Sequence, residues 1–182
     1  YITISELFRS LSTWEVADPV KLVCELYKVY RETTKSTESL DNFYFWGELL
    51  INDFDDADKN LARTSDLFSN LKELKNIMDD LSYMNPEQEA AIQQFFQNFS
   101  IERRTVLKER FISLWDVLGE IYTQFKGNLK QQNIAYEGML YREVMETFQV
   151  ENLPYDTYVF VGFNVLNKVE KELFKQLKDA GK

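Results

Sequence analysis

Apolar residues recur at spacings of three and four along most of the chain, which is the pattern of helices that bury one face. Side chains suited to capping mark where several of these helices begin. Thr3-Ile4-Ser5-Glu6 has the spacing of a capping box. Asp18-Pro19 and Asn85-Pro86 each place a capping side chain before a proline at the first helical position. The pattern therefore predicts helix starts at these three points.

The longest expected helix runs from Ser100 to about residue 130 and carries a near-heptad apolar seam: Leu107, Phe111, Leu114, Leu118, Ile121, Phe125 and Leu129. At about 1.5 Å per residue it would form a spine roughly 45 Å long, although Gly119 and Gly127 are unfavourable inside a helix. The other expected helices cover residues 18–33, 41–59, 65–81 (one helix or two short ones), 86–99, 137–148 and 167–178. We expect a mainly α fold, a multi-helix bundle with one long spine helix.

The pattern changes after Asn152-Leu153-Pro154. Residues 155–163 are β-branched and aromatic, which predicts a buried strand, the only convincing one in the chain. One strand cannot pair its own backbone, so we expect its partners elsewhere in a longer parent protein, or none. The first residue, Tyr1 rather than Met, favours an excised piece. We expect a boundary near residue 150 and a tail that packs on the helical body or pairs with a second copy.

Composition excludes several classes of catalytic and metal-binding site. The chain has 30 acidic and 21 basic residues, a net charge of −9, and 45% hydrophobic residues, which indicates a folded domain with an acidic surface. It has no His, which excludes Ser-His-Asp and Cys-His catalysis, His metal sites and imidazole pH switches. The one cysteine, Cys24, excludes an intrachain disulfide, fits a reducing cytoplasm and is expected to be buried. No apolar run is long enough to span a membrane.

The densest acidic segment is Asp53-Phe54-Asp55-Asp56-Ala57-Asp58, and carboxylates at this density can hold Mg²⁺ or Ca²⁺. An EF-hand loop does not fit, because Asp58 stands where Gly is needed and Thr64 where a bidentate Glu is needed. A diphosphate-binding aspartate motif fits poorly, because Lys59 stands at the third carboxylate position. We therefore favour a solvated helix end and expect no metal and no cofactor.

Two further groups have a nucleic-acid interpretation. A basic group of four residues opens the long helix, and Lys126 and Lys130 extend it: Arg103, Arg104, Lys108 and Arg110. These cations suit a contact with the DNA backbone, but the interleaved Glu102 and Glu109 favour an ordinary charged helix face. The consecutive aromatics Phe43, Tyr44, Phe45 and Trp46 suit base stacking, but such a run on a helix mostly covers a core.

Residues 159–167, Val-Phe-Val-Gly-Phe-Asn-Val-Leu-Asn, are followed by an amphipathic helix. This segment resembles motif II of superfamily I helicases, in which an apolar strand ends in Asp-Glu-Phe-Gln-Asp and a helix beginning with Gln follows. Phe163 keeps the aromatic residue and Asn167 the polar helix start. Val161 and Gly162 occupy the positions of the metal-binding Asp and the water-activating Glu, and neither can coordinate Mg²⁺ or polarise water. The resemblance implies a degenerate Walker B strand without ATP chemistry.

A motif II strand that ends in Gly-Phe is similar to AddB-type subunits of the AddAB helicase–nuclease, whose helicase half is inactivated. Residues 135–143 resemble the segment that precedes motif II there. Residues 43–48 and 53–59 resemble an AddB-like group of PD-(D/E)XK nuclease or inactivated helicase proteins. The resemblance covers most of the chain. It implies that residues 1–150 are a helical accessory (1B-like) subdomain and residues 151–182 the strand and helix of a truncated RecA-like domain.

The family resemblance implies a role in DNA repair and recombination. We expect a non-catalytic scaffold in double-strand-break processing, with weak DNA contact through the parent protein and a partner subunit of AddA type. Walker A and the nuclease would lie outside this chain, so no catalytic residue is expected. Two alternatives stay open: a stand-alone helical protein–protein interaction module, which the net charge favours, and a Mg²⁺ enzyme centred on residues 53–58.

Overall fold

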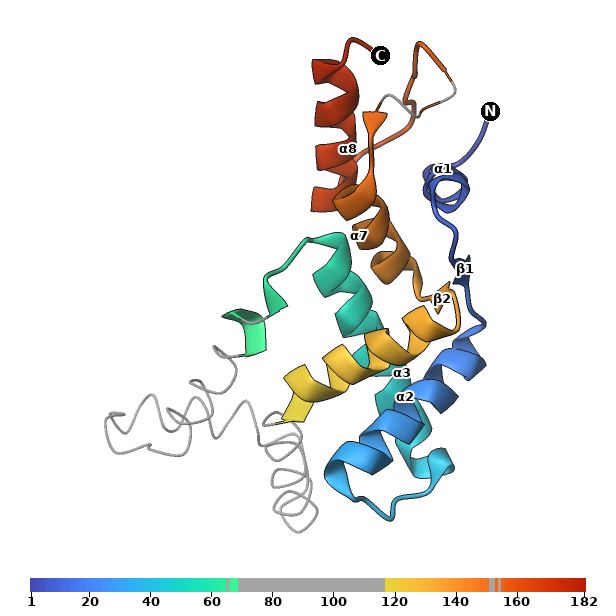
Figure 1. Cartoon of the computed structure of the whole chain (residues 1–182), viewed down its shortest axis with the longest axis vertical. Coiled ribbons are helices and arrows are strands. Elements are labelled where there is room, and N and C mark those ends of the chain that lie inside the picture. The colour runs from blue at the N-terminus through green and yellow to red at the C-terminus, as the bar shows by residue number, and fades with distance from the viewer. Residues whose placement is uncertain (65, 69–116, 151–152, 154) are drawn as a thin grey trace, which may run out of the picture. The chain divides into compact units, whose positions relative to one another are not determined.

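The computed structural model describes residues 1–64, 66–68, 117–150, 153 and 155–182. This part of the chain is mainly helical, as the sequence predicts, with one short parallel pair of strands (Figure 1). Contacts divide the chain into two compact units, residues 1–62 with 122–182 and residues 63–121. Most of the described residues belong to the first unit, and the sites discussed below lie in it.

The described helices are α1 (Ile4–Leu11), α2 (Pro19–Thr34), α3 (Leu40–Lys59), α7 (Glu137–Thr147) and α8 (Lys168–Asp179). A further helical segment, residues 117–131, is the described part of the expected spine and continues through Gly119 and Gly127. The helices expected at 18–33, 41–59, 137–148 and 167–178 are confirmed to within one residue at each end. The spine before residue 117, the helix at 86–99 and most of that at 65–81 lie outside the described residues.

Helix ends follow the capping chemistry. Thr3 and Glu6 form the expected capping box at the start of α1. The Asp18 carboxylate accepts a hydrogen bond from the Val20 amide at 2.8 Å, with Pro19 at the first helical position. Asn167 forms a second capping box with Glu170 and so starts α8. None of the described helices is long and apolar enough to cross a membrane.

Aromatic contacts hold the core of the first unit together. The ring of Phe8 stacks on Tyr141 at 4.1 Å and so joins α1 to α7. Phe125 stacks on Tyr136 at 5.9 Å, and Phe54 meets Tyr122 edge-on at 5.0 Å. Of the apolar seam, Phe125 and Leu129 are buried in this unit, and Leu118 and Ile121, which belong to the second unit, are buried as well.

Two strands pair with each other in this unit, and both are too short to be predicted from a sequence pattern. In β1 (Glu15–Val16) and β2 (Ile134–Ala135), Glu15 pairs with Ile134 in parallel register. The Glu15 amide donates to the Asn133 carbonyl at 3.0 Å, and the Ala17 amide to the Ala135 carbonyl at 2.9 Å. The pair therefore joins the beginning of the chain to the segment that enters α7.

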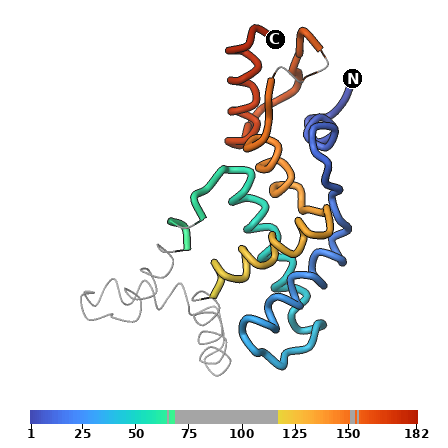
Figure 2. Tube along the Cα trace, viewed as in Figure 1, coloured from blue at the N-terminus to red at the C-terminus, as the bar shows by residue number. Residues whose placement is uncertain are grey.

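The strand predicted at residues 155–163 does not form within the described part of the chain. Gly162 has φ +87°, a conformation that glycine adopts readily and that lies outside the strand region, so the chain bends there. The trace turns back on itself before it enters α8 (Figure 2). Beyond the bend, α8 packs on α7 and buries Val169, Leu173 and Leu177, so the tail packs on the helical body. The boundary expected near residue 150 stays a prediction.

Candidate functional site

The bent segment, residues 155–166, is covered by α8 on one side. The Phe160 ring lies 4.0 Å from the ring of Phe174 between centroids, and Phe163 meets Phe174 edge-on at 5.4 Å. Both contacts place aromatic residues of the bent segment against the helix that follows it. One side of the segment is thus partly covered by the helix that follows it.

The other side of the bent segment is open. Val159, Val161 and Val165 are 81%, 82% and 89% exposed, and Phe160, between the first two, faces α8. This alternation is that of an extended chain. No hydrogen bond joins the backbone of residues 156–161 to another described residue. Exposed valines beside backbone groups that have no hydrogen bond to another described residue are typical of a segment that pairs with a further polypeptide segment.

Val161 and Gly162 lie at the bend. Neither residue brings a polar side chain, and a Cβ added to Gly162 would meet nothing within 4 Å. The bend falls at the position where the resemblance to motif II ends the strand, and Asn167 is the N-cap of α8. An apolar run, a bend and a capped helix thus follow one another in this part of the chain.

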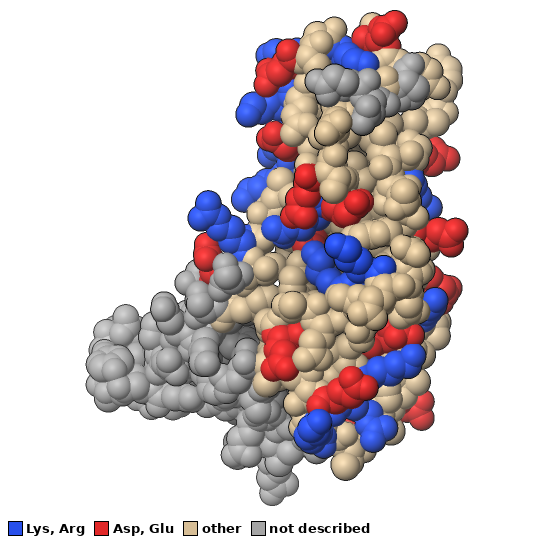
Figure 3. All heavy atoms as spheres, in the orientation of Figure 1, with Lys and Arg blue, Asp and Glu red and all other residues tan. Residues whose placement is uncertain are grey.

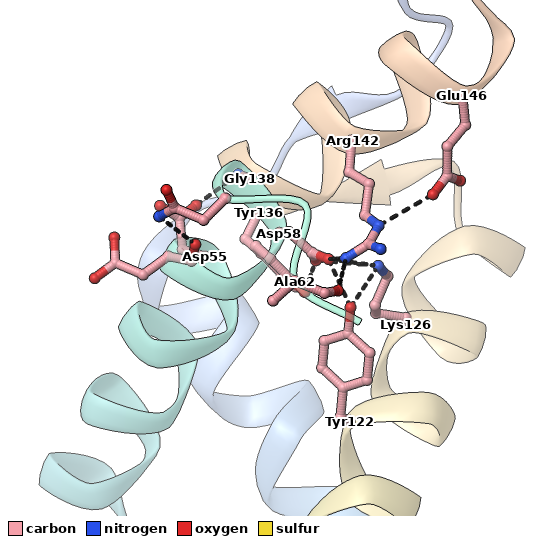
Figure 4. Close-up of polar contacts among 11 residues, drawn as sticks. Asp55, Asp58, Ala62, Tyr122, Lys126, Tyr136, Gly138, Arg142 and Glu146 are labelled. Atoms are coloured by element: carbon pink, nitrogen blue, oxygen red, sulfur yellow. Dashed lines mark hydrogen bonds and ion pairs between the residues drawn. The ribbon is translucent and has the colours of Figure 1, made fainter. Parts of the chain in front are cut away.

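The acidic segment is solvated only in part, because Asp53 and Asp56 are exposed as expected and Asp58 is not. Asp58 is fully buried, and its carboxylate oxygens accept five hydrogen bonds from four side chains (Figure 4). Tyr122 donates at 2.6 Å and Tyr136 at 2.5 Å. The expectation of a solvated segment is therefore wrong for Asp58, because α3 turns this one aspartate inward, toward polar partners from other elements.

Two cations complete this group, which we call the Asp58 cluster (Asp58, Tyr122, Lys126, Tyr136 and Arg142). The Lys126 ammonium lies 3.0 and 3.1 Å from the two carboxylate oxygens, and the Arg142 guanidinium 3.0 Å from one of them. Arg142 also donates to the Ala62 carbonyl at 2.9 Å and to Glu146 at 3.0 Å. Lys126, expected to extend a basic surface, is instead bound to a buried carboxylate.

Burial dominates the acid–base behaviour of this cluster. It raises the pKa of Tyr122 and of Tyr136, and the Asp58 charge adds to both shifts, so the phenols stay neutral and donate. Burial lowers the pKa of Lys126, with partial compensation by Asp58. Burial also opposes the charge of Arg142, but hydrogen bonds to Glu146 and Asp58 outweigh it and raise the pKa.

The geometry of the Asp58 cluster indicates a structural role. Both carboxylate oxygens are already occupied by donors, so Asp58 has little capacity left to bind a metal or accept a substrate proton. Asp58 and Ala62 are among the last residues of the first unit before residues 63–121 begin, and Tyr122 and Lys126 are among the first after them. The cluster therefore fastens together the two places where the chain leaves this unit and returns to it.

A second polar group joins α1, α3 and α7. Lys59 contacts Asp55 at 2.7 Å and Glu137 at 2.8 Å, and Ser5 donates to Glu137 at 2.7 Å. The Gly138 amide donates to the Asp55 carboxylate, which supplies an acceptor that the N-cap residue Tyr136 does not provide. Within the described residues, no group of three His, Cys, Asp or Glu side chains is placed to hold a metal ion.

The remaining predicted residues have mixed outcomes. Arg103, Arg104, Lys108 and Arg110 lie outside the described residues. Phe43 is buried, but Phe45 and Trp46 are 65% and 39% exposed, so the expectation that the aromatic run covers the core is wrong for these two. Cys24, expected to be buried, is half-buried. On the face drawn in Figure 3, Lys and Arg side chains are interspersed with Asp and Glu.

Sequence reasoning missed the Asp58 cluster. Its members come from positions 58, 122, 126, 136 and 142, and no local motif links them. A signal was present in the helical positions of Asp58, which falls four residues after Phe54 and eleven after Gly47 on the buried face of α3. Comparison of the chain with family models, with curated proteins and with solved structures finds no match.

Proposed function

We propose that the chain is a non-catalytic helical scaffold from an AddB-like DNA-repair protein, contacting DNA or a partner subunit of AddA type in double-strand-break processing. The observation that carries the proposal is the bend at Gly162. It lies where the motif II strand would end, and Val161 and Gly162 offer no carboxylate for ATP chemistry. The N-cap at Asn167 supports the same alignment.

On this proposal, residues 155–161 are a strand whose sheet partners belong to the parent protein. Val159 and Val161 are exposed, and the backbone beside them has no hydrogen bond to another described residue; both observations support it, because strands of a parallel sheet are covered on both faces. Residues 1–150 would then be the 1B-like accessory subdomain. Residues 151–182 would be the strand and helix of a RecA-like domain.

Hydrogen–deuterium exchange tests the proposed strand. In this chain alone, we expect the amides of residues 157–161 to exchange almost as fast as in an unstructured peptide. In the full polypeptide that the gene encodes, pairing in a sheet should slow them by at least about a thousandfold. The amides of the buried helix α7 serve as an internal reference in both samples. Fast exchange of residues 157–161 in the full polypeptide would exclude the strand and, with it, the proposed family.

The net charge of −9 favours a second candidate, a stand-alone protein-interaction module, because an acidic molecule repels phosphate. The exposed Phe45 and Trp46 on α3 are of the kind enriched at protein interfaces. Binding to a purified AddA-type subunit separates the two candidates. A scaffold of an AddB-like protein should form that complex, and a stand-alone module should not.

A further inference from the structure

Helix α8 carries four lysines in one row. Lys168, Lys171, Lys175 and Lys178 follow at spacings of three, four and three, which places them on one face of the helix. All four are exposed, and none makes an ion pair or a side-chain hydrogen bond with another described residue. Figure 3 shows Lys side chains in blue along α8. We call these four residues the lysine row.

Two of the three acidic side chains of α8 are engaged in other hydrogen bonds, and the third, Asp179, is exposed and follows Lys175 by four residues. Glu170 accepts from the Asn167 amide at 3.0 Å in the capping box, and Glu172 accepts from Gln176 at 3.1 Å. Lys168 stands at the first helical position, where the helix dipole disfavours a cation. The position of Lys168 therefore does not stabilise α8, whereas Lys178, in the last turn, is favoured by the same dipole.

The net charge around the lysine row is opposite in sign to the net charge of the whole chain. Residues 167–182 contain five Lys and three acidic residues, a net charge of +2. Residues 1–166 hold the remaining 16 basic and 27 acidic residues, a net charge of −11, and the two parts sum to −9. The helix itself, with four Lys and three acidic residues, has a net charge of +1, so attraction of a polyanion is stronger there than over the acidic rest of the chain.

The geometry of the lysine row suits a phosphate backbone. From Lys168 to Lys178 the helix rises about 15 Å, at about 1.5 Å per residue. One nucleic-acid strand places a phosphate roughly every 3.4 Å, so about four phosphates span the row. Membrane insertion is disfavoured, because the apolar face of α8 (Val169, Leu173, Leu177) is already buried. A lysine ammonium is a point charge that suits a phosphate backbone, whereas carboxylates are typically recognised by the bidentate geometry of arginine.

An aromatic side chain lies beside the lysine row. Phe174 is a surface neighbour of Lys171 and Lys178, three residues after the one and four before the other. Phe163 meets Phe174 edge-on and is 38% exposed. Cations next to an exposed ring are the combination that single-stranded nucleic acids engage through phosphates and unstacked bases.

We propose that the lysine row, with Phe163 beside it, binds the phosphate backbone of a single-stranded nucleic acid. This deepens the proposed function and rests on it, because it names the surface through which the scaffold contacts DNA. The exchange test of the strand does not involve these lysines, so either proposal can fail alone.

Fluorescence anisotropy with a labelled oligothymidine of about 20 nucleotides tests this proposal on the whole chain. Four phosphate contacts predict a salt slope near −3, hence about a fiftyfold loss of affinity between about 50 and 200 mM salt. Lys171→Glu with Lys175→Glu should weaken binding at low salt at least about tenfold and roughly halve the slope. The matched control, Lys21→Glu with Lys35→Glu, makes the same change of charge on α2 and its C-cap and should change binding less than about threefold.

Several results would overturn the proposal: no saturable binding at the lower salt, equal losses in the α8 pair and the control pair, or polyglutamate of similar length competing as well as oligothymidine. Binding of anionic phospholipid vesicles in preference to the oligonucleotide would also overturn it. Thermal melts of both variants should match the unsubstituted chain, because all four substituted lysines are exposed.

Discussion

Asp58 shows how one side chain can decide whether this fold is stable. Its charge is fully buried and balanced by Lys126 and Arg142, so removing it leaves Lys126 without its counter-ion and Arg142 with Glu146 alone. We expect Asp58→Asn to lower the free energy of unfolding by about 3 kcal/mol, measured by urea denaturation. Asp56→Asn, an exposed change on the same helix, should alter it by less than about 0.5 kcal/mol. Equal effects of the two substitutions would contradict a structural role for the cluster.

Alanine substitutions at two glycines are predicted to change the stability of the protein in opposite directions. A Cβ on Gly138 would lie 2.4 Å from the backbone carbonyl oxygen of Asp55, so α7 and α3 approach too closely there for any side chain. Gly127 lies inside the helix 117–131 with nothing within 4 Å of an added Cβ. We expect Gly138→Ala to destabilise the protein by about 3 kcal/mol and Gly127→Ala to stabilise it by about 0.5–1 kcal/mol. Denaturation midpoints that shift in the same direction would refute this account.

At the scale of elements, the junction of α1, α3 and α7 makes stability depend on pH. Burial raises the pKa of Glu137, but hydrogen bonds from Lys59 and Ser5 outweigh it and hold the pKa below its ordinary value of 4.5. The unfolded chain therefore binds this proton more readily, and the contribution of Glu137 to stability is present above pH 4.5 and lost as the pH falls below it.

We expect Glu137→Gln to lower stability at pH 7 and to flatten the decline in melting temperature between about pH 5 and pH 3. Glu32→Gln, an exposed change on α2, is the control and should leave both the stability and its pH dependence as they are. An unchanged acid decline in Glu137→Gln would show that other carboxylates govern it.

The helices could be predicted from sequence because their signals are local. The capping box at Thr3, the Asp18-Pro19 start and the 3.6-residue period each act within a few turns, and α1 and α2 begin where they indicate. The strand predicted at residues 155–163 does not form in the described part of the chain. Its β-branched composition reflects a preference for a pleated sheet, which the described chain does not provide, and Gly162 bends the backbone instead.

The Asp58 cluster and the pairing of β1 with β2 depend on tertiary contacts. Each β strand has two residues, and register over two residues leaves no period to detect. For Asp58, composition and density favoured a solvated helix end. Asp58 is nevertheless buried, because it lies on the buried face of α3. There its carboxylate accepts hydrogen bonds from Lys126, Tyr136 and Arg142, which are far from it in the sequence.

At the scale of the whole molecule, charge limits affinity for DNA. A net charge of −9 repels phosphate over a Debye length of about 8 Å at physiological salt, so only local basic surfaces contribute. The candidate that the sequence offers is Arg103, Arg104, Lys108 and Arg110, although its interleaved glutamates favour an ordinary charged helix face. We expect Arg104→Glu with Lys108→Glu to weaken oligonucleotide binding about tenfold at low salt, additively in free energy with the lysine-row pair.

The quadruple variant measures that additivity in the same anisotropy titration. Loss of all detectable binding in the quadruple variant, with intermediate losses in each pair, is the expected outcome. Binding unchanged by Arg104→Glu with Lys108→Glu would mean that this basic group is an ordinary charged helix face, the alternative that its interleaved glutamates favour.

The parallel pairing of Glu15 with Ile134 has a consequence for how the chain folds during synthesis. Closing that contact spans 134 − 15 = 119 residues, and the chain entropy lost in closing such a loop costs about 4 kcal/mol. Contacts this distant in sequence slow folding relative to a bundle of neighbouring helices. While the ribosome is still making residues 63–121, Phe8 and Phe54 lack the rings of Tyr141, Tyr122 and Phe125 that later cover them. Phe8 in the nascent chain therefore stays without its stacking partner until Tyr141, the fifth residue of α7, has been translated.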